Sequence, residues 1–191
     1  PAAAYPVDCA ILLCLAGGWP ASAECAHARA VFIARITPWP VEPPLQIWNC
    51  PMHAEFRRET AVERLFDIAF QPSSQPRLSL PTLPFPAPIP VVDQADIDIS
   101  DPAYDFARSI RVYQVEYRRS RVHDDCNVWS TARLGTYGEQ GDYAWRRSSV
   151  DKLPPASSFS PSSGCSDYYF RSVFADWKDY EGTYGFEEVR Y

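Results

Sequence analysis

The sequence has no apolar run long enough to cross a bilayer. The apolar stretch over residues 10–16 is much shorter than the roughly 20 residues that a membrane-spanning helix needs. Asp8 precedes this stretch and no positively charged region comes before it, so it is also a poor signal peptide. We therefore expect no membrane span and no recognisable signal peptide in this chain. Pro1 favours a start directly after a removed initiator methionine.

The sequence also lacks the familiar motifs of catalysis and metal binding. It contains no phosphate-binding loop, no G-x-S-x-G, no HExxH and no CxxC pair. Two spacings, Cys50-Pro-Met-His53 and His123-Asp-Asp-Cys126, resemble half of a metal site, but zinc sites usually need two paired half-motifs. The remaining histidine, His27, lies on an alanine-rich helix face. We therefore expect no enzymatic activity, no catalytic residue, no metal and no cofactor.

Positive charge is in short supply. The chain has 18 Lys and Arg residues against 24 Asp and Glu residues, a net charge of −6. Nucleic-acid binding through phosphate contacts needs a basic face, so we expect no direct nucleic-acid binding. Two local basic clusters interrupt this pattern, and both are expected to be solvated: Arg57, Arg58 and Arg64, and Arg118, Arg119 and Arg121.

Glycine is scarce, with eight residues against nineteen prolines, whereas 46% of the chain is hydrophobic and therefore able to form a core. Apolar residues alternate with proline over residues 80–90, a pattern that favours polyproline II. Because this segment carries large apolar side chains, we expect it to lie on its own domain or on a neighbouring subunit. The residues expected to contact a partner are Leu80, Leu83, Phe85, Ile89, Trp39 and Trp48.

Hydrophobic periodicity divides the chain into a helical half and a strand half. Helices are predicted over residues 8–16, over 22–36 with Ser22 as N-cap, and over 53–70. From about residue 107 the period changes to two, and further strands are predicted over 128–137, 142–148, 168–176 and 184–190. The predicted fold class is α+β. Its parts are a disulfide-stapled helical hairpin with a third helix (1–70), a Pro-rich extended connector (71–106) and an antiparallel β-domain (107–191).

One tetrapeptide occurs twice in the strand half. Gly135-Thr-Tyr-Gly138 recurs as Gly182-Thr-Tyr-Gly185. Two glycines that flank a Thr-Tyr pair suit a bulge or a tight bend.

Six cysteines, an even number, are consistent with three disulfides. Cys9 and Cys14 are five residues apart, so on one helix they point in different directions and do not easily pair. A hairpin that turns at Gly17-Gly18 would bring Cys14 to Cys25 and leave Cys9 for Cys50. The preferred disulfides are Cys9–Cys50, Cys14–Cys25 and Cys126–Cys165. An alternative pairing, Cys9–Cys25 with Cys14–Cys50, stays open. Disulfides indicate that the finished protein works outside the cytoplasm.

The cysteine block has a distinctive layout. Cys9, a short apolar stretch, Cys14-Leu15, a small-residue turn and Cys25 are followed by an aromatic-rich segment that ends in Cys50-Pro51. Over about residues 8–52 this layout resembles the TrbM family of conjugal transfer proteins. The resemblance implies a small disulfide-bonded accessory protein of a transfer machine that works outside the cytoplasm.

These observations favour a non-enzymatic structural or interaction protein of an extracytoplasmic assembly. The first hypothesis is a virion component of a phage or phage-like particle, such as a tail or capsid accessory protein, whose cysteines oxidise after lysis. One alternative is a TrbM-like periplasmic accessory protein of conjugal DNA transfer. Another is a small hydrolase with a site in the β-domain, built from His123 with Asp124 or Asp125. The partners expected for the first two are protein subunits of a larger assembly, and whether these include further copies of this chain stays open.

Overall fold

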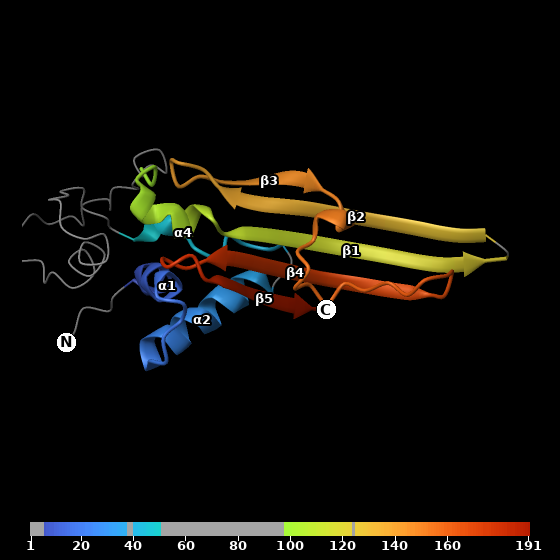
Figure 1. Cartoon of the computed structure of the whole chain (residues 1–191), viewed down its shortest axis with the longest axis horizontal. Coiled ribbons are helices and arrows are strands. Elements are labelled where there is room, and N and C mark those ends of the chain that lie inside the picture. Colours follow the sequence, from blue (N-terminus) through green and yellow to red (C-terminus); the bar gives the residue numbers. More distant parts are fainter. Residues whose placement is uncertain (1–5, 38–39, 51–97, 124) are drawn as a thin grey trace, which may run out of the picture.

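A five-stranded antiparallel sheet with helices on one face forms the body of the protein (Figure 1). The computed structural model describes residues 6–37, 40–50, 98–123 and 125–191. The strand order is β3-β2-β1-β4-β5, so the first strand of the sheet lies at its centre. This architecture confirms the predicted α+β fold class. In the described ranges, no helix is both long and apolar enough to cross a membrane.

The first two helices form the predicted hairpin. Helix α1 spans Val7–Ala16 and helix α2 spans Ala23–Ile36, each within one residue of the prediction. The Ser22 hydroxyl accepts a hydrogen bond from the backbone N–H of Cys25 at 3.1 Å and so caps α2. Between the helices the chain reverses at Gly18, whose φ of 67° is readily adopted by glycine.

Two disulfides staple this hairpin. Cys14 is joined to Cys25, which ties α1 to α2, and Cys9 is joined to Cys50, which ties α1 to the segment that follows α2. This is the preferred pairing, and the swapped pairing is not the one in the structure. The third disulfide joins Cys126 to Cys165, as predicted.

The strands follow the predicted change of period. Strands β1 (Arg111–Val122) and β2 (Asp125–Tyr137) form a long hairpin, and β3 (Tyr143–Ser148), β4 (Tyr168–Lys178) and β5 (Tyr184–Arg190) complete the sheet. Short helical segments occupy the connections: η1 (Ile47–Asn49), η3 (Pro102–Tyr104), α4 (Asp105–Arg108) and η4 (Val150–Lys152).

The C-terminal end of the predicted extended connector is helical instead. Residues 102–108 form η3 and α4, because the Asp101 carboxylate accepts a hydrogen bond from the N–H of Ala103 at 2.8 Å and Pro102 occupies the first helical position. Tyr104 and Phe106 from these turns are buried, so β1 begins only at Arg111. The predicted helix over 53–70 and the rest of the connector lie outside the described residues.

The helices and one half of the sheet share a single core. Phe32 of α2 meets Trp177 of β4 edge to face at 5.5 Å between ring centroids, and Trp19 contacts both rings. Val112 and Ala175 from the central strands are fully buried beneath them. The described part of the N-terminal region is therefore packed on the β-sheet within one hydrophobic cluster. Figure 1 shows the helices gathered at one end of the sheet.

Two buried polar contacts hold the segment after α2 against this core. The Asp8 carboxylate forms an ion pair with the Arg35 guanidinium and also accepts from the backbone N–H of Gln46 at 2.9 Å. The Tyr137 hydroxyl accepts from the Leu45 N–H at 3.0 Å and donates to the Leu45 carbonyl at 2.6 Å. Burial raises the pKa of Tyr137 well above its usual range, so this hydroxyl keeps its proton.

The repeated Gly-Thr-Tyr-Gly sequence is explained by close aromatic packing. Gly135 lies in β2 and Gly185 in β5, and both are on the helix-covered side of the sheet. A Cβ atom at Gly185 would lie 2.7 Å from the Trp177 ring, and one at Gly135 would overlap the Tyr143 hydroxyl. These glycines allow a large ring to lie against the strand; the positive φ that suits a tight bend occurs at Gly182.

Candidate interaction surface

The predicted partner-binding residues fall into two groups. Leu80, Leu83, Phe85, Ile89 and Trp39 lie outside the described residues. Trp48 is described, and its half-buried ring packs against the core between the helices and the sheet. Contact of Trp48 with a partner stays a prediction.

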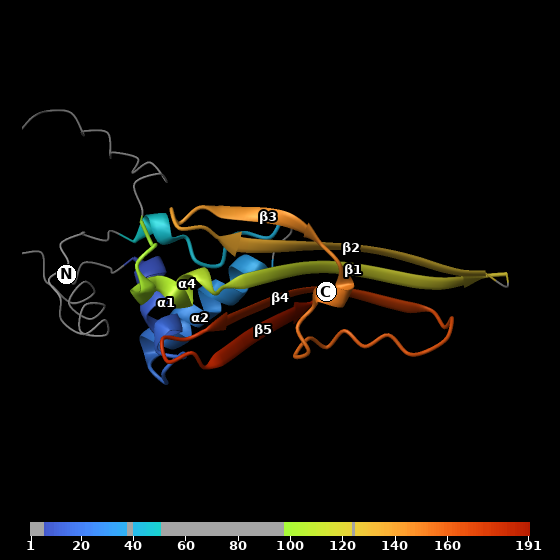
Figure 2. The same ribbon diagram turned by 45° about the horizontal axis from the view of Figure 1, so that its top comes forward.

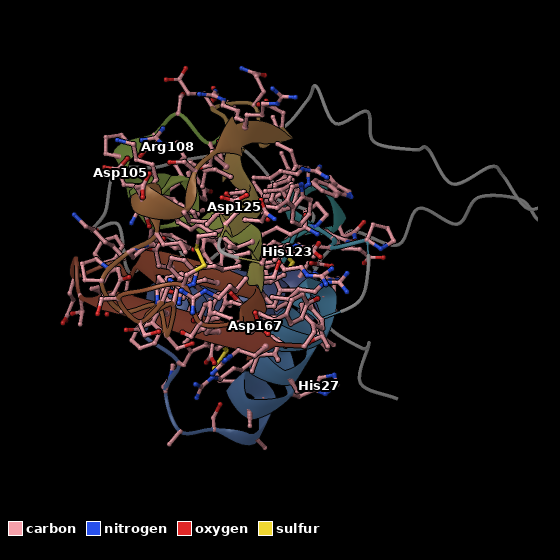
Figure 3. The ribbon with its side chains drawn as sticks, turned by 90° about the vertical axis from the view of Figure 1, so that its right-hand side faces the viewer. His27, Asp105, Arg108, His123, Asp125 and Asp167 are labelled. Atoms are coloured by element: carbon pink, nitrogen blue, oxygen red, sulfur yellow. A yellow bond between two sulfur atoms is a disulfide. The ribbon has the colours of Figure 1, made fainter. Side chains whose placement is uncertain are left out.

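The residues of the predicted hydrolase site lie at the far tip of the β1–β2 hairpin. His123 is exposed in the turn between the two strands, and Asp125 is exposed at the start of β2. Figure 3 looks along the strands from this end, with both residues near the viewer and His27 apart on α2. Asp124 lies outside the described residues. His123 is therefore open to solvent, whereas closed active sites expel water from around the reacting groups.

The cysteines of the two metal-like spacings are oxidised. Cys50 and Cys126 are each in a disulfide, which removes the thiolate that a metal would need. The described ranges contain no cluster of three or more His, Cys, Asp or Glu side chains that could hold a metal ion. His53, the partner of Cys50 in its spacing, is outside those ranges.

The predicted basic cluster at the end of β1 is divided by strand alternation. Arg119 faces the loop between β3 and β4 and is 7% exposed. Its guanidinium donates to the carbonyls of Ser162 at 2.8 Å and Ser166 at 2.9 Å, so it fastens that loop to the sheet. The expectation of a solvated residue is wrong for Arg119. Arg118 points to the opposite side and is exposed, as expected.

The loop between β3 and β4 covers the sheet face opposite the helices. Phe159 from this loop packs edge to face on Tyr117 and Phe170, with centroids 5.1 Å apart in each pair. The Cys126–Cys165 disulfide ties the end of the loop to β2. Figure 2 shows the loop crossing the sheet on its way to β4.

The helix-covered face, by contrast, is only half covered by the described residues. The strands run on beyond the helices towards the hairpin tip (Figures 1 and 2). The strand registers place one group of side chains on this uncovered part, which we call the open face: Glu116, Arg118, Ser120, Val122, Asp125, Asn127, Trp129, Thr131, Arg133, Arg147, Tyr169 and Arg171. With four arginines against Glu116 and Asp125, the open face is basic in an acidic chain.

An aromatic–arginine–aromatic row crosses the open face. Arg118 of β1 lies opposite Trp129 of β2 on one side and opposite Tyr169 of β4 on the other. Trp129 is 51% exposed and Tyr169 is 55% exposed. Arg, Trp and Tyr are the residue types most enriched at binding hot spots, because they combine large contact area with hydrogen bonding.

A second feature of the open face is a cross-strand pair of like charges. Arg133 of β2 lies directly opposite Arg147 of β3, and both are exposed. The Arg133 guanidinium lies over the Trp145 ring at 4.9 Å from its centroid. Like charges directly opposite each other are destabilising, so this pair does not stabilise the sheet.

The two carboxylates of β5 are engaged in contacts outside the open face. Glu187 forms an ion pair with Arg29 of α2, and Glu188 accepts hydrogen bonds from Ser157 and from the N–H of Ser158. On the opposite face, Arg111 is paired with the buried Asp176, which holds the pKa of that guanidinium above its usual value. These pairs stabilise the fold. On the open face itself Glu116 lies directly opposite Arg171, so the excess positive charge there comes from Arg118, Arg133 and Arg147.

The alternation of β1 was the one signal in the sequence that could have revealed this surface. It places Arg118 and Arg119 on opposite sides, but the sequence does not say which side the loop covers.

Comparison of the chain with protein-family models, with curated proteins and with solved structures found no match.

Proposed function

We propose that this protein is a non-enzymatic interaction subunit of an extracytoplasmic assembly, and that its open face binds an acidic surface of a partner protein. The observation that carries the proposal is the pair of opposed arginines, Arg133 and Arg147, beside the exposed Trp129–Arg118–Tyr169 row. A partner carboxylate between the two guanidiniums would relieve their repulsion by charge-assisted hydrogen bonds. The neighbouring rings would supply apolar contact area.

The disulfides support the proposed extracytoplasmic compartment. All six described cysteines are in disulfides, and such bonds persist in secreted, periplasmic and particle-associated proteins. The assembly that we propose first is a virion of a phage or phage-like particle. The conjugal transfer apparatus is the second candidate, favoured by the Cys9–Cys50 and Cys14–Cys25 disulfides, which lie in the block that resembles the TrbM family.

Neighbouring arginines of β3 provide a matched test. Arg147 lies on the open face, whereas Arg146 is exposed on the opposite face of the same strand. Arg147→Glu should reduce the amount of the protein in the purified assembly at least tenfold, and Arg146→Glu should leave it unchanged. Quantitative mass spectrometry of purified particles and of the periplasmic fraction measures this and tells the two assemblies apart. Equal incorporation of both variants, or absence of the wild-type protein from both fractions, would overturn the proposal.

A further inference from the structure

In the part of the chain that the structure describes, the outer edge of β2 is unpaired over about half of its length. Strand β3 pairs only with residues 132–137 of β2. Residues 125–131 pair with β1 on one side, and no residue in the described ranges pairs with them on the other. In Figure 1, β2 continues towards the tip beyond the end of β3.

The registers determine which backbone groups point out of this edge. The Arg121 N–H donates to the carboxylate of Asp167, which lies next to β4, at 3.1 Å. Backbone groups alternate between the two sides of a strand, so odd-numbered residues of β1 direct their N–H and C=O towards β4 and even-numbered residues direct them towards β2. Val122 lies opposite Asp125, and odd-numbered residues of β2 therefore bond to β1. Beyond the end of β3, the outward groups are the N–H and C=O of Cys126, Val128 and Ser130. The Gly138 N–H, which bonds to the Asp142 carbonyl at 2.8 Å on the β3 side, agrees with this parity.

The edge lacks the features that usually prevent strands from joining. Natural edges are protected by charged residues, prolines or bulges. The segment Cys126-Asn-Val-Trp-Ser130 contains no charge and no proline, and its ladder with β1 is continuous. Val128 is 56% exposed on the loop-covered face and Trp129 is 51% exposed on the open face.

We propose that this edge pairs antiparallel with the same segment of a second copy of the chain, around a two-fold axis at Val128. The outward groups of Val128 would bond to those of its own counterpart, and those of Cys126 would bond to those of Ser130. Each such pair exchanges two N–H···O bonds, and the two sheets become one continuous sheet. The proposal deepens the proposed function by naming one partner, but it rests on backbone geometry and not on the charge of the open face.

The side chains favour a second copy because this register is self-complementary. Val128 faces Val128, Asn127 faces Trp129 and Asp125 faces Thr131, so no like charges are opposed. Pairs of β-branched residues across strands stabilise a sheet, and a two-fold interface requires only such self-complementarity.

Sedimentation equilibrium of the oxidised full chain over a wide concentration range tests the proposal. We expect a monomer–dimer equilibrium for the wild type. Val128→Pro should raise the dimer dissociation constant at least tenfold, because proline removes an N–H that no group in the described ranges accepts, whereas Val128→Thr keeps this N–H and should still dimerise. A wild type that stays monomeric at every concentration, or a Val128→Pro dimer as tight as the wild type, would overturn the proposal.

Hydrogen exchange on the wild type gives a second readout that needs no variant. Protection of the amides of Val128 and Ser130 should rise with protein concentration, while the amide of Arg121, bonded within the chain, should not change. Concentration-independent exchange at Val128 and Ser130 would refute edge pairing even if Val128→Pro failed to fold. A monomeric wild type whose incorporation still depends on Arg147 would overturn only the dimer. A dimer whose incorporation ignores Arg147 would overturn only the proposed function.

Discussion

Asp8→Asn should be among the most destabilising single substitutions in this protein. The Asp8 side chain is buried, and its carboxylate is the acceptor for three different groups. Arg35 forms the ion pair, the Gln46 N–H donates at 2.9 Å and the Asn49 side chain donates at 3.2 Å. These contacts join α1, α2 and the segment that ends at Cys50.

The magnitude follows from what the substitution leaves behind. Arg35 has only 13% of its side chain exposed, and without the Asp8 charge its guanidinium would stay desolvated with no counter-ion. Breaking a buried ion pair by removing one partner costs about 3–5 kcal/mol. Domains of this size are stable by only about 5–15 kcal/mol, so the loss is a large fraction of the total.

Urea unfolding under non-reducing conditions measures this effect, with exposed Glu139→Gln as the matched control. We expect a lower midpoint with an unchanged slope for Asp8→Asn and no change beyond about 0.5 kcal/mol for the control. Combining Asp8→Asn with Arg35→Met should restore part of the loss, because no unpaired charge remains. A loss below about 1 kcal/mol, or strictly additive effects in the double variant, would refute the reasoning.

Two further predictions concern the far half of the sheet and the buried tyrosines. Replacing both Cys126 and Cys165 with serine should cost roughly 4 kcal/mol, from the 39-residue separation, without unfolding the helical end; calorimetry and near-UV circular dichroism check this. Burial raises the pKa of Tyr137 well above its usual range and that of Tyr104 to about 12. Because the unfolded chain releases these protons near pH 10, stability should be intact below pH 10 and fall above it by about 1.4 kcal/mol per pH unit per tyrosine. Tyr137→Phe should flatten this slope in urea midpoints measured from pH 9 to 11.

Local signals explain why the helical hairpin could be predicted from the sequence. Ser22 caps α2, and Gly17-Gly18 ends the preceding helix, so both boundaries are encoded by residues next to them. The disulfide pairing followed from the same hairpin, because a turn at that position leaves Cys14 beside Cys25. The positions of the strands could be predicted equally well, since a period of two is itself a local pattern.

Features that depend on contacts between distant segments could not be predicted in this way. Arg119 is buried because the loop between β3 and β4 folds over it, and nothing near Arg119 in the sequence encodes that loop. The row of Arg118 with Trp129 and Tyr169 exists only because two strand registers align them. The helical turns over 102–108 were not predicted for a different reason. The Asp101-Pro102 pair marks a helix start, but it follows a proline-rich stretch, in which a further proline also suits an extended segment.

Strand β2 presents three different surfaces within a few residues, and alternation keeps them separate. Cys126 points to the loop-covered face and is fixed there by its disulfide, while Trp129 points to the open face. The backbone of Val128 points out of the edge, in a third direction. Because the disulfide and Arg119 hold the loop on one face only, they stiffen the far half of the sheet without covering the other two surfaces. A substitution at Trp129 therefore tests the open face and a proline at Val128 tests the edge, and these effects should combine additively unless one partner spans both.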